Sequence, residues 1–169
     1  MKQYRYVGPD ELRELVCPEK AGTPIQRLQD ILGWIKRTSQ KGLLHGEVIA
    51  TFVINTKGIL CLAERHTEHI ACAGGDAVLS AGEMSFSIAQ NQIEVTYVTN
   101  QSTGYCPEPE SWPAVAQALD KLGLSHPNGF SYEFVFRRCQ RCQTINIIKE
   151  DWFVCAVCGC ELNGLSTLA

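Results

Sequence analysis

The sequence from position 136 to 162 reads FRRCQRCQTINIIKEDWFVCAVCGCEL, and it contains two Cys-x-x-Cys pairs. The first pair is Cys139 and Cys142, and the second is Cys155 and Cys158. Each pair can present two thiolates on one tight turn, so that four sulfur atoms meet as a tetrahedron. The spacing predicts one structural zinc ion (Zn²⁺), held by four cysteine thiolates in a small zinc ribbon.

The residues around the two pairs support this prediction. Residues 144–148 and 152–154 favour β-structure, and the charged residues between them favour a turn, so we expect the hairpin of a ribbon here. Cys160 is a surplus sulfur that could replace Cys158, but the regular pair spacing favours Cys158. Four thiolates close the coordination sphere, so the predicted zinc stabilises the fold and has no position for a catalytic water.

Length and composition indicate an ordinary globular chain. It has 169 residues, 45% of them hydrophobic and 20% charged, with a net charge of −3. This balance fits one domain with a small appendage and gives no chain-wide basic field for nucleic acid. No apolar run suggests a secretory signal or a membrane span, and nine cysteines cannot all pair. We therefore expect a cytoplasmic protein without membrane contact, whose paired cysteines bind metal.

The first third of the chain is expected to be helical. Thr23-Pro24-Ile25-Gln26 is typical of a helix start, because threonine can cap, proline suits the first helical position and glutamine can close a capping box. Apolar residues then recur at helical spacing, with Trp34 beside the stripe. The stripe consists of Ile25, Leu28, Ile31, Leu32 and Ile35. Gly42 and Gly46 predict a loop.

The middle of the chain is expected to form strands. Residues 48–54 are almost continuously apolar, as in a strand buried on both faces. Residues 83–88 and 93–97 alternate apolar and polar side chains around a turn near Asn91, which predicts a hairpin with one solvent-facing side. A helix is expected from about Glu110, ending at Gly123.

These elements predict an α+β fold, in which helices flank a mainly antiparallel sheet and a zinc ribbon follows at the C-terminal end. The expected divisions are a helical segment at 1–45, an α+β core domain at 46–135 and the ribbon at 136–169. Alternating aromatic residues from Phe130 to Phe136 predict a last strand that runs directly into the first cysteine pair. We therefore expect the ribbon to dock on the sheet.

A set of small and polar residues in the middle of the chain forms a recognisable pattern. In order, it comprises His69, Gly74 or Gly75, Ala81-Gly82-Glu83, Asn100, Ser102, Gly104, Tyr105 and Pro107. This pattern resembles a domain family of bacterial proteins, some toxin-like, and of plant IQ-motif calmodulin-binding proteins. The family has a serine after its histidine and a histidine between its glycine and tyrosine, and this chain lacks both. The resemblance implies no cofactor.

The same stretch supplies the candidate catalytic residues. His69 and Glu83 can form an acid/base pair, and Tyr105 or Cys106 follows on the loop before the helix. Each also has an ordinary structural interpretation: a loop histidine, a solvated strand glutamate, and a loop tyrosine or cysteine.

Three functions follow from these patterns. The leading hypothesis is a recognition or adaptor protein whose central domain binds a protein partner or small ligand. The alternative is a small hydrolase or transferase that uses His69, Glu83 and Tyr105 or Cys106. A nucleic-acid-binding ribbon is disfavoured, because acidic residues balance the basic residues of the C-terminal part. The basic residues are Arg137, Arg138, Arg141 and Lys149, and the acidic ones are Glu133, Glu150, Asp151 and Glu161.

Overall fold

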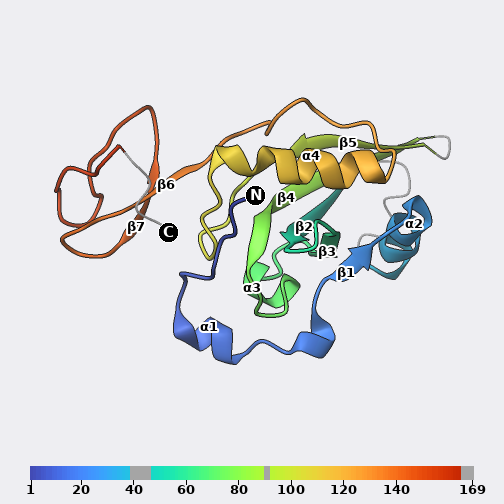
Figure 1. The fold of residues 1–169 in the computed structure, drawn as a ribbon, viewed down its shortest axis with the longest axis horizontal. Helices are drawn as coiled ribbons and strands as arrows, with labels where there is room; N and C mark the ends of the chain where they lie inside the picture. Colours follow the sequence, from blue (N-terminus) through green and yellow to red (C-terminus); the bar gives the residue numbers. More distant parts are fainter. Residues whose placement is uncertain (39–46, 90–91, 165–169) are drawn as a thin grey trace.

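The computed structural model describes residues 1–38, 47–89 and 92–164 (Figure 1). The loop predicted at Gly42 and Gly46 and the turn predicted near Asn91 lie outside these residues. Within the described ranges, no helix is long and apolar enough to cross a membrane.

The centre of the fold is a five-stranded antiparallel sheet with the order β1-β3-β2-β4-β5. The strands are β1 (Thr23–Ile25), β2 (Glu47–Asn55), β3 (Leu60–Glu64), β4 (Val78–Ala89) and β5 (Gln92–Val98). The α+β prediction is confirmed. Strand β2 lies at the centre, and its apolar residues except the half-buried Ile49 are buried on both faces, as the continuous pattern predicts.

Helices cover both faces of the sheet. They are α1 (Asp10–Glu14), α2 (Leu28–Arg37), α3 (His69–Cys72) and α4 (Trp112–Lys121), with 3₁₀ turns at Pro18–Lys20 and Pro109–Ser111. Helices α2 and α4 pack on the face that carries Phe52 and Phe86. Helix α3 packs on the opposite face, which carries Val53 and Ala81, together with three tyrosines. These tyrosines are Tyr4, Tyr6 and Tyr105.

The predicted helix start at Thr23-Pro24-Ile25-Gln26 is wrong. Residues Thr23–Ile25 form the edge strand β1, in which Thr23 faces Leu62 of β3. An edge strand tolerates Pro24, because a residue without an N–H is accepted where one side of the strand is unpaired. The helix begins at Leu28 instead, and the side chain of Asp30 accepts hydrogen bonds from the backbone N–H groups of Gln26 and Arg27. Because β1 belongs to the central sheet, the N-terminal segment shares that sheet with the core.

The hairpin of β4 and β5 has the predicted solvent-facing side, with one correction. Glu83 lies on the opposite face of the sheet from the buried Met84, as the alternation predicts. In β5, however, Tyr97 is exposed and Val98 is buried. The register shifts between Ser85 and Phe86, which leaves Thr96 as the extra residue of a β-bulge and reverses the alternation beyond it.

The predicted last strand is shorter than its aromatic pattern. Only β6 (Val135–Arg138) is a strand, and it pairs with β7 (Ile145–Ile148) in a separate two-stranded sheet. The ribbon hairpin therefore joins β6 to β7, and the expected pairing of residues 144–148 with 152–154 is wrong. Before β6, the backbone N–H and carbonyl of Phe134 bond the side chain of Asn100, which takes the place of a strand partner.

Gly82 in β4 lies so close to the backbone of Thr99, just beyond the end of β5, that no side chain fits. A Cβ atom there would come within 1.9 Å of the carbonyl oxygen of Thr99. We expect Gly82→Ala to lower the free energy of unfolding by about 3 kcal/mol or more, because the obstacle is backbone. Urea denaturation measures this loss. Gly129→Ala is the matched control, since nothing lies within 4 Å of its Cβ position; equal stability of both variants would contradict the packing.

Candidate functional site

The four predicted metal ligands meet at one point. The Sγ atoms of Cys139, Cys142, Cys155 and Cys158 all lie within 4.8 Å of one another. Two of the separations, Cys139 to Cys158 and Cys142 to Cys155, are 3.5 Å. Zinc bonded to sulfur at about 2.3 Å gives a tetrahedron with edges of about 3.8 Å. The cluster could therefore hold a single metal ion, and the predicted meeting of the four cysteines is observed.

The two cysteine turns have the same backbone structure. In each, the residue after the second cysteine has a left-handed backbone, with φ of 63° at Gln143 and 70° at Gly159. Its N–H donates to the carbonyl of the first cysteine at 2.9 Å, from Gln143 to Cys139 and from Gly159 to Cys155. This geometry brings both sulfur atoms of a pair to one side of the turn.

The equivalence of the two turns gives Cys160 a structural place outside the cluster. The N–H of Cys155 donates to the carbonyl of Cys160, as the N–H of Cys139 donates to the carbonyl of Thr144. Cys160 is thus the counterpart of Thr144. Its Sγ lies 3.5 Å from Nη1 of Arg141.

Hydrogen bonds around the cluster favour thiolates. Backbone N–H groups of Cys158 and Val157 lower the pKa of Cys155 to about 6. Asn146 adds its Nδ2 at 3.6 Å from that sulfur, and its Oδ1 accepts from the N–H of Ala156. Contacts with the side chain and backbone of Thr144 lower the pKa of Cys142. These contacts favour the thiolate at Cys155 and Cys142. At Cys158 the backbone hydrogen bond from Cys160 acts in the same direction, but burial and hydrogen bonds with the other three cysteines raise its pKa to about 12.

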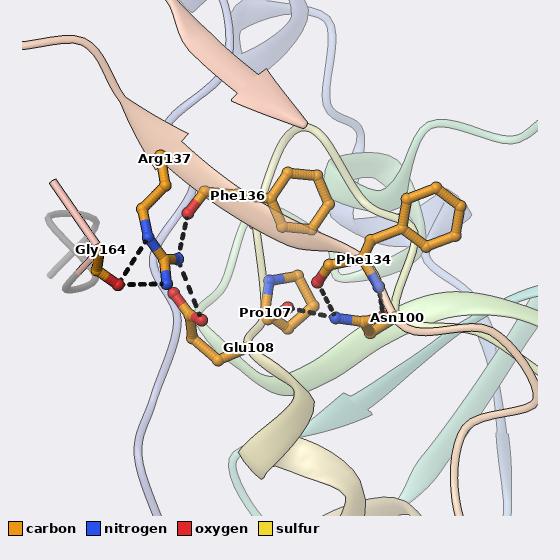
Figure 2. A network of polar contacts seen from close by, with 7 residues as sticks. All are labelled: Asn100, Pro107, Glu108, Phe134, Phe136, Arg137 and Gly164. Atoms are coloured by element: carbon orange, nitrogen blue, oxygen red, sulfur yellow. Dashed lines mark hydrogen bonds and ion pairs between the residues drawn. The ribbon is translucent and has the colours of Figure 1, made fainter. Parts of the chain in front are cut away.

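An arginine and a glutamate join the ribbon to the core (Figure 2). Arg137 of β6 is only 8% exposed, and its Nη1 lies 3.5 Å from Oε2 of Glu108. The same guanidinium donates from Nη1 to the carbonyl of Phe136 at 2.7 Å and from Nη2 to that of Gly164 at 2.8 Å. A buried charge with this many partners fixes the ribbon in one orientation.

Asn100 makes the second connection (Figure 2). Its fully buried Nδ2 donates to the carbonyls of Pro107 at 2.7 Å and Phe134 at 2.8 Å, and its Oδ1 accepts from the N–H of Phe134 at 2.7 Å. Nearby, Phe136 packs against Cys106. The ribbon thus docks on the loop that includes Asn100 and Cys106, rather than directly on the strands of the sheet.

His69 and Glu83 come together at a polar cavity of about 400 Å³. His69 is the first residue of α3, and Glu83 follows Gly82 in β4. We call this cavity, which His69 and Glu83 both line, the polar cavity. Its lining consists of Thr51, His66, Thr67, Glu68, His69, Glu83, Gln101 and Thr103. Every lining side chain can hydrogen-bond, which suits a polar ligand.

The protonation state of His69 follows from its contacts. Its Nε2 lies 3.1 Å from the carbonyl oxygen of Gly82, which can only accept, so the proton is on Nε2 and the lone pair is on Nδ1. Burial lowers the pKa of His69, against the opposing effects of that carbonyl and of Glu68 and Glu83. The imidazole is therefore a neutral acceptor at pH 7. At the rim, Oε1 of Glu83 lies 3.8 Å from Nε of Arg65.

The lowered pKa of His69 predicts a measurable titration. In an NMR titration, the imidazole midpoint should lie below 6.5, the ordinary value. As the pH falls, His69 becomes protonated at a higher pH in the unfolded chain than in the folded chain. The stability that neutral His69 contributes is therefore present above pH 6.5 and is lost as the pH falls through the pKa of His69 in the folded chain. His69→Gln should remove this part of the acid sensitivity, and a midpoint above 6.5 would contradict the buried neutral histidine.

Tyr105 and Cys106 do not line the polar cavity. The hydroxyl of Tyr105 donates to the carbonyl of Asp76 at 2.6 Å, and its ring meets Tyr6 edge-on. Burial raises the pKa of Tyr105. Cys106 is buried with its Sγ 3.2 Å from the carbonyl of Thr103, and burial raises its pKa to about 12. Neither side chain is placed to attack a ligand beside His69.

Of the lining of the polar cavity, the sequence analysis identified His69 and Glu83 as candidate site residues and missed the others, among them Thr51 and Gln101. Thr51 is the only hydroxyl residue of the apolar run at 48–54, and the strand register places it opposite Glu83. That single polar residue on the predicted core strand was the available signal. Gln101 gave no signal, since it belongs to a loop that only the fold brings to α3.

Comparisons with known proteins give no match to this chain, either among family models, among curated proteins or among solved structures.

Proposed function

We propose that the protein is a recognition module, which binds a polar ligand in the polar cavity and is braced by a zinc ribbon. The observation that carries this proposal is the lining of that cavity. It offers an acceptor on His69, a carboxylate on Glu83 and hydroxyl groups on neighbouring threonines. Such a mixture of donors and acceptors suits a small ligand rich in hydroxyl or amide groups, or a polar segment of a protein partner.

The positions of the candidate nucleophiles favour binding over catalysis. Covalent catalysis needs an activated nucleophile within hydrogen-bond reach of its base. Tyr105 donates to a backbone carbonyl, and the thiol of Cys106 holds its proton because its pKa is raised. A hydrolase or transferase based on His69 and Glu83 would have to activate water without help from Tyr105 or Cys106.

The proposed metal is one zinc ion with a structural role. Four thiolates match the preference of zinc, and a complete set of protein ligands leaves no position for substrate. Among the described residues the cysteines form no disulfide, which agrees with a reducing compartment. A cytoplasmic location is therefore part of the proposal, and the resemblance to the bacterial and plant domain family stays a hypothesis based on its motif.

Nucleic-acid binding is disfavoured, because Arg137 is buried and acidic residues of the C-terminal part balance the more exposed Arg138 and Arg141. Arg137 is buried against Glu108, and Arg138 donates to the carbonyl of Gln143 at 3.3 Å. Arg141 contacts the sulfur of Cys160. Phosphate contacts require accessible cationic side chains.

The test is an NMR titration of the zinc-loaded full chain with glucose, N-acetylglucosamine and the tripeptide Ser-Gly-Ser. We expect saturable shifts at His69, Glu83 and Thr103 with at least one of these probes. His69→Ala should abolish them. Tyr105→Phe is the control and should retain them. Shifts centred elsewhere, or none with any probe, would refute binding at the polar cavity, and chemical conversion of a probe would establish the enzyme instead.

A further inference from the structure

The floor of the polar cavity is formed by the central sheet. Thr51 of β2 and Glu83 of β4 are directly opposite each other in the strand register, so their side chains lie next to each other on one face. His69 lies beside them, because its Nε2 contacts the carbonyl of Gly82. The loop that follows β5 contributes to the lining as well. Since β2 and β4 are both inner strands of the sheet, these groups are held in place before any ligand arrives.

Two polar atoms of the polar cavity lack a partner and are accessible. Thr51 is only 2% exposed, yet its hydroxyl forms no hydrogen bond within the described residues. Nδ1 of His69 carries a lone pair and has no partner there either. In the described chain, the only unpaired side-chain atom that is sealed from solvent is Oε1 of Glu108, which lies elsewhere. A ligand can therefore reach both atoms, and polar atoms in such sheltered positions are normally paired.

Three groups of the polar cavity can only accept hydrogen bonds. They are the carboxylates of Glu68 and Glu83 and the Nδ1 atom of His69. Arg65 approaches Glu83 from the rim, but 3.8 Å is too long for a hydrogen bond. Glu68 forms no ion pair in the part of the chain that the structure describes. The lining itself contains no lysine or arginine, so it has two formal negative charges and no positive one.

The spacing of these acceptors suits an ammonium group better than a bare metal ion. Among residues 1–38, 47–89 and 92–164, the four ribbon cysteines alone bring three or more possible ligand atoms close enough together for one ion. An ammonium group is larger, and its three N–H groups diverge towards separate acceptors. It also brings the positive charge that the lining lacks, whereas a neutral hydroxyl brings one donor and no charge.

We propose that the ligand of the polar cavity carries a protonated primary amino group, which donates to Glu83, to Nδ1 of His69 and to the hydroxyl of Thr51. This proposal rests on the recognition function proposed above and names the chemical class of its ligand. An amino sugar and the N-terminus of a peptide both offer such a group. The side chains of Gln101 and Thr103 can bond the neutral remainder of the ligand, since they both donate and accept.

Pairs of probes with and without the charged amino group test this proposal. Glucosamine is compared with N-acetylglucosamine, and Ser-Gly-Ser with N-acetyl-Ser-Gly-Ser, in NMR titrations of the zinc-loaded full chain at pH 7. In at least one pair the amine should bind at least about tenfold more tightly, because acetylation removes a charged donor. The pair that shows this preference identifies the body of the ligand.

The outcomes separate this proposal from the recognition function. Equal affinities within both pairs, with saturable shifts at His69, Glu83 and Thr103, would overturn the amine and leave recognition of a polar ligand standing. The absence of saturable shifts at these residues with all four probes would overturn both.

Variants separate the effect of charge from that of shape. Glu83→Gln keeps the size of the side chain and should remove most of the preference for the amine. Glu94→Gln, at an exposed position of β5 outside the cavity, is the matched control and should keep it. Thr51→Val keeps the β-branched shape, should fold, and should weaken the amine by removing one acceptor. An undiminished preference in Glu83→Gln would overturn the proposal.

Arg65→Gln gives the opposite sign. It removes a cation that competes for Glu83, so the amine probes should bind several-fold more tightly. Weaker binding of these probes to Arg65→Gln would mean that the arginine holds the ligand, and would also overturn the assignment.

Discussion

The Cys142→Ser protein should lose tight zinc binding and the folded ribbon. Apparent zinc-binding free energies of structural sites are about 10–16 kcal/mol, and serine is a far poorer ligand than a thiolate. The ribbon has few buried residues apart from its cysteines, so the metal supplies most of its stability. We expect zinc content near zero after dialysis and a lower Tm, while the five-stranded sheet, with its own core, stays folded.

Cys160→Ser is the matched control for this result. Cys160 follows the second turn as Thr144 follows the first, so its sulfur should not be a ligand. Zinc content and Tm of Cys160→Ser should equal those of the unmodified protein. If Cys160→Ser released the metal and Cys142→Ser retained it, the ligand assignment would be wrong.

Asn100→Asp should destabilise the protein by about 3 kcal/mol or more, although the two side chains have the same shape. The amide Nδ2 now donates to the carbonyls of Pro107 and Phe134. A carboxylate would place an oxygen against those two carbonyl oxygens and leave them without a donor in a fully buried position. Urea denaturation measures the loss of free energy of unfolding.

Two further observations distinguish this effect from general damage. Asn128→Asp, at an exposed position, should leave the stability within about 0.5 kcal/mol of the unmodified protein. Zinc content of Asn100→Asp should be unchanged, because the four ligands lie in the ribbon itself. A stability like that of Asn128→Asp would mean that Asn100 does not connect the ribbon to the core.

The parts of the structure that sequence predicts well depend on local spacing. The Cys-x-x-Cys turns and their left-handed residue after each pair are determined within a few positions, so the metal site could be identified before the fold. Alternation along the strands likewise predicts which side of β4 carries Glu83. It fails in β5, since one bulge at Thr96 exposes Tyr97.

The failures arise where distant residues decide a local structure. Thr23-Pro24-Ile25 has the chemistry of a helix start, but pairing with β3 makes it a strand. Phe134 continues an aromatic alternation, but Asn100 bonds its backbone. Tertiary contacts override such local preferences, and a single sequence gives no sign of them.

In the candidate site, too, contacts between distant residues decide what the sequence alone does not predict. His69 and Glu83 meet because α3 packs over β2, the neighbour of β4, and His69 contacts the carbonyl of Gly82 in β4. Tyr105 and Cys106, adjacent in sequence, face two different clusters. The pair of Glu108 and Arg137 could not be foreseen, because it joins two segments that meet only when the ribbon docks.

X-ray absorption at the zinc edge measures whether four thiolates close the coordination of the metal. The measurement uses the full chain without a tag, after removal of loosely bound metal. We expect one zinc per chain with four sulfur neighbours at about 2.3 Å. Three sulfur atoms with an oxygen or nitrogen neighbour, which would mean an open coordination position, or no retained zinc at all, would contradict it.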